Sequence, residues 1–190
     1  PRVGHWEFTT LVPTLGTVVM PPGKSSFTVS DIPGIIEGAS ENKGLGLEFL
    51  KHIERSSGIV FVLGMDKPNP LNELNILINE LKTHGIEDID RAVVVCNKCD
   101  LTDNKLDIQG QYKLLEDFVE LKNKEILQQK IAKNKKKADE NKEEIDESQI
   151  YWDIIPISAK NNQNIDILKD KLLNLVFDKG NIKRKRLVDE

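Results

Sequence analysis

The sequence lacks several features that would indicate other classes of protein. No apolar run approaches the roughly 20 residues that a transmembrane helix needs, so no membrane span is predicted. Acidic residues outnumber basic ones by 31 to 27, and the formal net charge of −4 provides no overall positive field for nonspecific nucleic-acid binding. Cysteine is scarce: Cys96 and Cys99 are the two present, and the three histidines are scattered. A zinc site needs a second pair of ligands at suitable spacing, and a low cysteine count is typical of a reducing compartment.

A phosphate-binding loop of the form Gly-x₄-Gly-Lys-Ser/Thr is also missing from these 190 residues. Residues 23–25 read Gly-Lys-Ser, but position 18 is valine where the motif needs glycine. The motif also needs a helix after it, whereas an apolar strand is expected to begin at Phe27. We therefore interpret residues 21–25 as the turn of a β-hairpin between the apolar run 17–20 and the strand that begins at Phe27.

The sequence does contain an alternation of apolar strands and amphipathic helices. Strands are expected at residues 27–30, 58–64, 92–96 and 153–157, and helices at residues 41–55, 71–83, 112–145 and 165–176, the last capped by Asn164. This order predicts βαβ units in one α/β domain, with a mainly parallel sheet that is buried on both faces. Residues 107–150 are rich in Lys, Glu, Asn and Gln, and we expect a charged helical insertion. Its first half should pack on the body, and a solvated extension should follow around residues 133–147.

Three polar signatures follow apolar runs in this order along the chain: Asp31 with Gly34, then residues 97–100 (NKCD), then residues 158–160 (SAK). Asp-x-x-Gly alone is typical of a turn, but the three together are unlikely to arise by chance. Ligands of open α/β sheets bind at the carboxyl ends of the strands, where such side chains gather. Asp31 is expected to hold Mg²⁺, through water because this ion dehydrates reluctantly. The N–H of Gly34 is expected to approach a terminal phosphate, a contact that a β-carbon would hinder.

The second and third signatures predict a guanine-binding pocket. The Asp100 carboxylate can accept both N–H groups on the edge of guanine, whereas adenine has no such donor pair. A pocket built in this way can reject the wrong base by ~10⁴-fold. Asn97 is expected to tie the neighbouring loops to the base, and the Lys98 stem to cover the ring. Residues 158–160 are expected to complete the pocket, chiefly through the Ala159 N–H to the guanine oxygen.

Residues 8–16, 31–39 and 44–55 resemble the distinctive run of the Obg family of GTPases almost throughout. The likeness extends through residues 97–100 and 155–159 and thins in the charged segment between these two. The resemblance implies a Ras-like G domain of the P-loop NTPase class, a three-layer α/β sandwich. The strand and phosphate loop that open such a domain, and the family's glycine-rich N-terminal domain, are not in this sequence. We therefore expect a piece of a longer protein, or a truncation that cannot hold the triphosphate.

The resemblance divides the chain into a partial GTPase domain over residues 1–182 and a basic tail over residues 183–190. It places switch I in the first run and begins switch II at Gly34. It implies that Thr10 binds Mg²⁺ and gives its N–H to the γ-phosphate, with Thr9 as the alternative. Ile35 stands where many GTPases carry a water-orienting glutamine, which implies slow intrinsic hydrolysis.

The residues expected to act in catalysis are Thr10, Gly34 and Ile35, and those expected to bind Mg²⁺ are Thr10 and Asp31. The nucleotide is expected to contact three segments: Phe8, Thr9, Thr10, Leu11 and Val12; Asp31, Ile32, Pro33 and Gly34; and Asn97, Lys98, Cys99, Asp100, Ser158, Ala159 and Lys160.

The resemblance implies a molecular switch that binds GTP and GDP with Mg²⁺, hydrolyses GTP, and acts with ribosomal RNA and proteins in assembly of the large ribosomal subunit. Residues 41–46 are similar to those of eukaryotic organellar members, which favours mitochondria over the cytoplasm or nucleolus. One alternative is a degenerate module that docks on the ribosome without turnover. Another is an ATPase or kinase on a related fold, which residues 97–100 disfavour.

Overall fold

The computed structural model describes residues 14–23, 25–31, 53, 55–83, 85–101, 107–136 and 151–177. In chain order, the described elements are β1 (Thr14–Val18), β2 (Phe27–Asp31), β3 (Ile59–Gly64), α2 (Pro70–Thr83), β4 (Ala92–Asn97), α3 (Ile108–Lys135), β5 (Trp152–Pro156) and α4 (Ile165–Phe177). The predicted alternation of strands and helices is confirmed from β3 onward. The helix predicted over residues 41–55 lies almost entirely outside the described residues. None of the described helices is long and apolar enough to cross a membrane.

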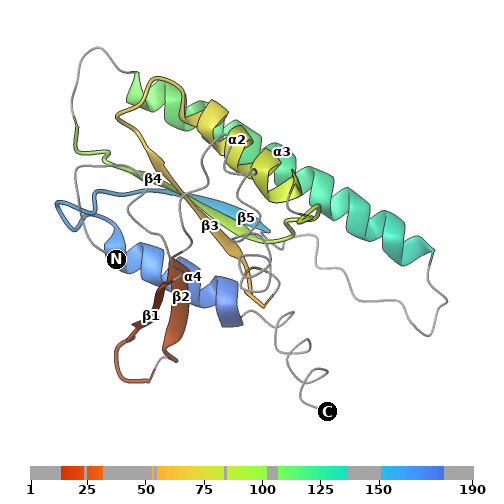
Figure 1. The fold of residues 1–190 in the computed structure, drawn as a ribbon, viewed down its shortest axis with the longest axis horizontal. Helices are drawn as coiled ribbons and strands as arrows, with labels where there is room; N and C mark the ends of the chain where they lie inside the picture. Colours follow the sequence, from red (N-terminus) through yellow and green to blue (C-terminus); the bar gives the residue numbers. More distant parts are fainter. Residues whose placement is uncertain are drawn as a thin grey trace.

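A parallel sheet in the order β3-β4-β5 forms the middle layer. Successive β4 side chains point to opposite faces, so Val94 joins one hydrophobic cluster while Val93 and Val95 join another. Helices α2 and α3 lie together over the first face and α4 covers the second (Figure 1). The predicted three-layer α/β architecture is confirmed, and burial on both faces explains why β4 is apolar throughout.

Trp152 is the largest fully buried side chain in the described core. Its ring stacks on Phe61 with centroids 5.6 Å apart and meets Phe118 of α3 edge-on at 6.2 Å. Its indole Nε1–H donates to the Ile89 carbonyl at 2.9 Å, so the polar atom of this buried ring has a partner. The ring therefore joins β5 to both β3 and α3.

Helix α3 is part of this core, as expected for its first half, and Ile126 in its second half is buried as well. Leu115 is fully buried, and the Asn123 side chain binds the backbone of β5. Asn123 Oδ1 accepts from the N–H groups of Tyr151 and Trp152 at 2.9 and 2.8 Å, and Nδ2 donates to the Trp152 carbonyl at 2.8 Å. Despite its charged composition, α3 therefore has one buried apolar stripe, and its Asn123 side chain is hydrogen-bonded to the backbone at the start of β5.

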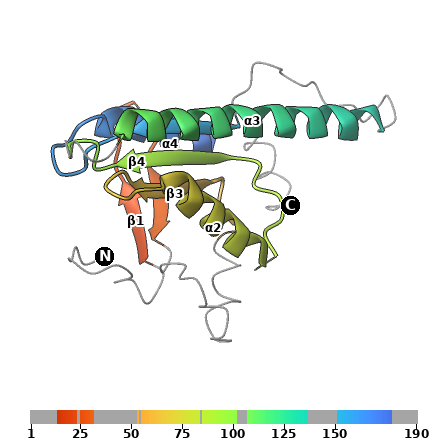
Figure 2. The ribbon, with the colours of Figure 1, turned by 90° about the horizontal axis from the view of Figure 1, so that it is seen from above.

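The bounds of α3 differ from the prediction at its start. The helix begins at Ile108 rather than near residue 112, because the Asp107 carboxylate caps it by accepting from the Gly110 N–H at 2.9 Å. It stays helical to Lys135, and its C-terminal turns extend past the strands of the sheet (Figure 2). The remainder of the predicted extension lies outside the described residues.

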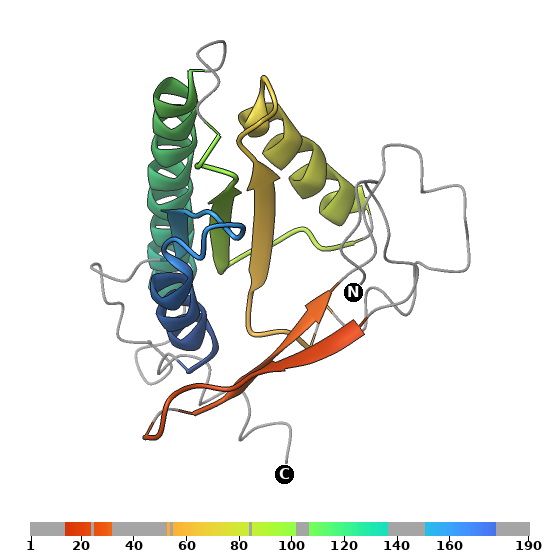
Figure 3. The same cartoon turned by 90° about the vertical axis from the view of Figure 1, so that its left-hand side faces the viewer.

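Strands β1 and β2 form the predicted antiparallel hairpin, with Thr14 opposite Asp31 and Val18 opposite Phe27. The hairpin makes its own two-stranded sheet below the parallel one (Figure 3). The strand predicted over residues 27–30 is confirmed as β2, but its expected burial is wrong beyond the first residue: Phe27 is buried, whereas Val29 is exposed. Among the described strands, β2 pairs with β1 and with no other; Thr28 and Val29 are exposed, and Ser30 and Asp31 are half-buried.

Burial of β3 on both faces was also predicted, and it is incomplete. Phe61 and Leu63 point into the core, but Val62 on the other face is 60% exposed. Helix α4, which covers that face, packs mainly against β4. The uncovered end of β3 borders the hollow described below.

Helix α2 ends at a glycine whose backbone conformation is left-handed. Gly85 has φ +88°, its N–H donates to the Lys82 carbonyl at 2.9 Å, and the Ile86 N–H donates to the Leu81 carbonyl at 3.0 Å. This is the Schellman arrangement, in which glycine avoids the clash that a β-carbon meets in the left-handed region.

Gly85→Ala should lower the free energy of unfolding by about 1 kcal/mol, as measured by denaturant titration. A β-carbon at this position would meet no atom within 4 Å, so the loss comes from backbone strain rather than from crowding. Gly85→Asn is the matched control, because asparagine tolerates the left-handed region better and should lose less. Equal losses for the two variants would contradict this explanation.

Candidate functional site

A hollow with a volume of about 290 Å³ lies at the carboxyl ends of β3 and β4. Its lining is made of Val62, Leu63, Gly64, Lys67, Glu73, Asn97 and Lys98. It includes the first two residues of the predicted guanine signature. Its position at the carboxyl edge of a parallel sheet is where ligands of open α/β sheets bind.

Asn97 joins the two loops that were predicted to hold a base. Its Oδ1 accepts from the N–H of the adjacent Lys98 at 2.8 Å. It also accepts from the Ala159 N–H at 3.0 Å, although Ala159 lies 62 residues further along the chain. Beside it, the Cys99 N–H donates to the Ile157 carbonyl at 3.1 Å. Residues 97–100 and 158–160 are therefore neighbours. The Ala159 N–H, expected to donate to the guanine oxygen, is occupied by Asn97 and would have to be shared or released.

The predicted base residue Ser158 shapes the loop after β5, together with Asn161 and Gln163. Ser158 is fully buried, its Oγ accepts from the Asn161 N–H at 3.1 Å, and its backbone pairs with that of Gln163. The serine hydroxyl thus supports the loop, while Lys160 is exposed.

Asn164 occupies the capping position of α4 in a different way from the one predicted. Its carbonyl accepts from the Leu168 N–H, as a cap residue does, but its φ is +59°. Its side-chain amide donates to the Pro156 carbonyl at 2.8 Å, so it ties the start of α4 to the end of β5.

Lys98 is held by an acidic residue that sequence reasoning missed. Its Nζ lies 2.6 Å from Oδ2 of Asp66, which follows β3 by two residues. The only signal in the sequence was a carboxylate just after an apolar run. The Lys98 ammonium holds the pKa of Asp66 below its ordinary value, so the Asp66 carboxyl is ionised at neutral pH. Any stability that it contributes is lost only as the pH falls through that lowered pKa.

The two cysteines near this loop are both free thiols. Cys99 Sγ donates to the Cys96 carbonyl at 3.1 Å. Burial raises the pKa of Cys96 to about 12 and also raises that of Cys99. Both keep their protons at neutral pH, whereas nucleophilic attack and metal binding need thiolates.

The predicted phosphate and metal residues are not assembled in the described part of the chain. Asp31 ends β2 in the hairpin sheet and does not line the hollow. Among the described residues, no group of three or more His, Cys, Asp or Glu side chains could hold a metal ion. The other predicted phosphate-side residues lie outside the described ranges: Phe8, Thr9, Thr10, Leu11, Val12, Ile32, Pro33, Gly34 and Ile35.

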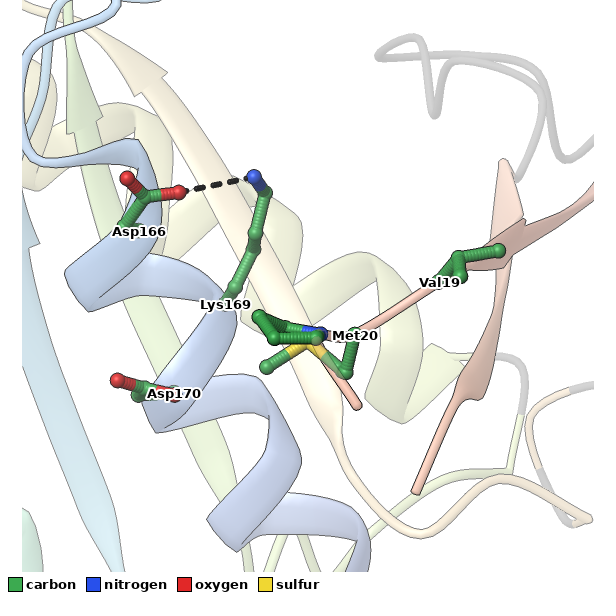
Figure 4. Close-up of a pocket in the computed structure, with 6 residues that line it drawn as sticks. Val19, Met20, Asp166, Lys169 and Asp170 are labelled. Atoms are coloured by element: carbon green, nitrogen blue, oxygen red, sulfur yellow. Dashed lines mark hydrogen bonds and ion pairs between the residues drawn. The ribbon is translucent and has the colours of Figure 1, made fainter. Parts of the chain in front are cut away.

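A second hollow, of about 370 Å³, lies between the hairpin and α4 and is lined by Val19, Met20, Pro21, Asp166, Lys169 and Asp170. Figure 4 shows the Lys169 side chain directed to Asp166, with Nζ 2.9 Å from Oδ1. No predicted site residue lines this hollow, whereas Asn97 and Lys98 line the first one.

A family model described as "50S ribosome-binding GTPase" matches residues 1–98, about half of the chain. The chain belongs to this GTPase family. The resemblance to Obg proteins is confirmed by several relatives of that name. GTPase Obg of Flavobacterium psychrophilum is 42% identical over 119 residues, and that of Phocaeicola vulgatus is 49% identical over 107 residues. These alignments cover 62% and 56% of this chain, and 35% and 27% of the relatives.

A eukaryotic relative is similar over almost the whole chain. The protein named "GTPase MTG2, mitochondrial" of Saccharomyces cerevisiae is 43% identical over 183 residues, which is 94% of this chain and 30% of that relative. The chain therefore spans about a third of the length of the relatives it matches. The similarity extends across the charged segment where the likeness to the family was expected to thin.

Proposed function

We propose that the protein containing this chain binds guanine nucleotides, with the base between residues 97–100 and 158–160. The observation that carries this proposal is the Asn97 side chain, which joins the two loops through Ala159 at 3.0 Å. Asp100 follows in the same turn, where its carboxylate can accept both N–H groups of guanine.

The proposed reaction is hydrolysis of GTP to GDP with Mg²⁺. Asp31 provides a carboxylate oxygen, the ligand type that this ion prefers, and Thr10 or Thr9 is the proposed second ligand. The Gly34 N–H is proposed to contact the γ-phosphate. Ile35 has no polar atom with which to orient the attacking water, so slow intrinsic turnover is expected.

The proposed role is that of a molecular switch in assembly of the large ribosomal subunit, in mitochondria. The description of the family as 50S ribosome-binding and the name of the yeast relative support this role. We also propose a GTPase domain over residues 1–182 with a basic tail over residues 183–190.

Nucleotide titration of the full-length protein with Mg²⁺ tests the proposal. GDP and GTP should bind about 10³-fold or more tightly than ADP and ATP, because adenine leaves the Asp100 carboxylate unpaired. Release of phosphate from GTP then measures turnover. Equal affinity for both bases would reject the guanine site, and guanine binding without turnover would favour a docking module.

A further inference from the structure

We infer that Asp66 is a positioning residue that holds the Lys98 side chain in place as one wall of the base pocket. The inference deepens the proposed function and rests on it. It assigns a role to an acid outside the three signatures, on a different strand–helix connection from the lysine that it binds.

Both ends of Lys98 are fixed. Its backbone has φ +67°, an uncommon conformation for a residue with a side chain, and its N–H donates to Asn97 Oδ1 at 2.8 Å. Its Nζ lies 2.6 Å from Asp66 Oδ2. The methylene stem between these two points therefore has a defined course.

That course lies along the hollow at the carboxyl ends of β3 and β4. Lys98 is part of the lining of this hollow, and Asp66 is not. The acid thus binds the tip of the lysine without lining the hollow itself. Lysine stems cover apolar surface readily, so an anchored stem can lie against the face of a bound ring.

Gly64 provides the space for this contact. A β-carbon at Gly64 would lie 2.5 Å from Asp66 Oδ1 and 3.8 Å from Lys98 Nζ. Any larger residue would therefore push the carboxylate away from its present place. Gly64, Asp66 and Lys98 form one unit, which we call the lysine anchor.

The lysine anchor should act on affinity and not on the choice between guanine and related bases. A side chain that is ordered before binding loses less conformational freedom when the ligand arrives. A stem lying on the ring face serves any purine of the same shape, whereas Asp100 reads the 2-amino group. Loss of the lysine anchor should therefore weaken the binding of GDP and of its inosine analogue IDP by the same factor.

The test is a double-mutant cycle in the full-length protein, with the Kd of GDP and IDP measured by titration. Asp66→Asn keeps the shape of the side chain and removes its charge. It should raise the Kd of both nucleotides about fivefold, the upper range for a partly exposed ion pair. Lys98→Met keeps a stem and removes the ammonium. In the Lys98→Met background, Asp66→Asn should have no further effect, because the acid acts through the lysine.

Salt and a matched ion pair provide controls. At 1 M salt the screening length is about 3 Å, so the difference in GDP Kd between the wild type and Asp66→Asn should become smaller. Glu125→Gln breaks the Lys122–Glu125 pair on α3, which has the same 2.6 Å separation and lies away from the hollow. It should leave the GDP affinity within twofold of the wild-type value.

Two results would overturn the inference while leaving the guanine site in place. One is tight GDP binding by Asp66→Asn at the wild-type Kd. The other is an equal loss of GDP affinity on Asp66→Asn in the wild-type and in the Lys98→Met backgrounds. A wild-type protein that binds neither GDP nor IDP would overturn the proposed function and this inference together. Thermal unfolding of each variant separates a misfolded variant from a weak binder.

Discussion

Asp100→Asn should reverse the base preference of the protein from guanosine to xanthosine nucleotides. The carboxylate accepts two N–H groups from guanine, and an amide cannot, because its NH₂ would face a donor. Xanthine carries a carbonyl where guanine carries the amino group, so it can accept from that NH₂. The affinity for GDP should fall by about 10³-fold or more, since buried polar groups would be left unpaired.

Competition between GDP and XDP for the purified variant measures this reversal. Asp117→Asn on α3 is the matched control, because it removes a carboxylate that is 58% exposed and pairs with Lys113. This control should bind both nucleotides as the wild type does. An Asp100→Asn protein that still prefers GDP would show that another group reads the base.

Leu115→Ala should destabilise the fold by about 2–5 kcal/mol, while Leu114→Ala should change the stability by less than about 0.5 kcal/mol. The two leucines are neighbours in α3, so the intrinsic helix propensity changes equally in both variants. Leu115 is 0% exposed in the core cluster, whereas Leu114 is 56% exposed. The predicted difference therefore reports packing alone.

Urea titrations of the two variants provide the measurement, and Leu121→Ala, at 54% exposure on the same helix, is a second control. A small loss for Leu115→Ala would mean that α3 is held by its polar contacts to β5 and not by its buried stripe. Similar losses for both neighbours would mean that the burial seen here does not govern stability.

Several elements were predictable because their signals are local. Residues 92–96 are uniformly apolar, and a strand buried on both faces needs that composition. The helix predicted over residues 71–83 ends where expected, and Gly85 just after it adopts the left-handed conformation that closes a helix. The base loops were predictable because each follows an apolar strand in a recognisable order.

Other features depend on residues that are distant in sequence. The apolar spacing in residues 107–150 predicted that the first half of this segment packs on the body, but the Asn123 contacts to β5 depend on where α3 is placed. Exposure of Val62 and Val29 has the same origin, since periodicity does not reveal which neighbouring element covers a face. Asp66 was missed because nothing in its local sequence indicates the partner 32 residues away.

The sequence by itself determined the alternation of strands and helices, the family, and the residues proposed to read the base. These follow from short-range patterns, because the spacing of residues along the chain indicates where each one lies on a strand, helix or loop. Only the tertiary structure decided which atoms meet: Asn97 Oδ1 with the Ala159 N–H, and Lys98 with Asp66, an acid outside the predicted signatures. Hydrogen bonds and ion pairs act over about 3 Å in space, and a linear order of residues does not contain that distance.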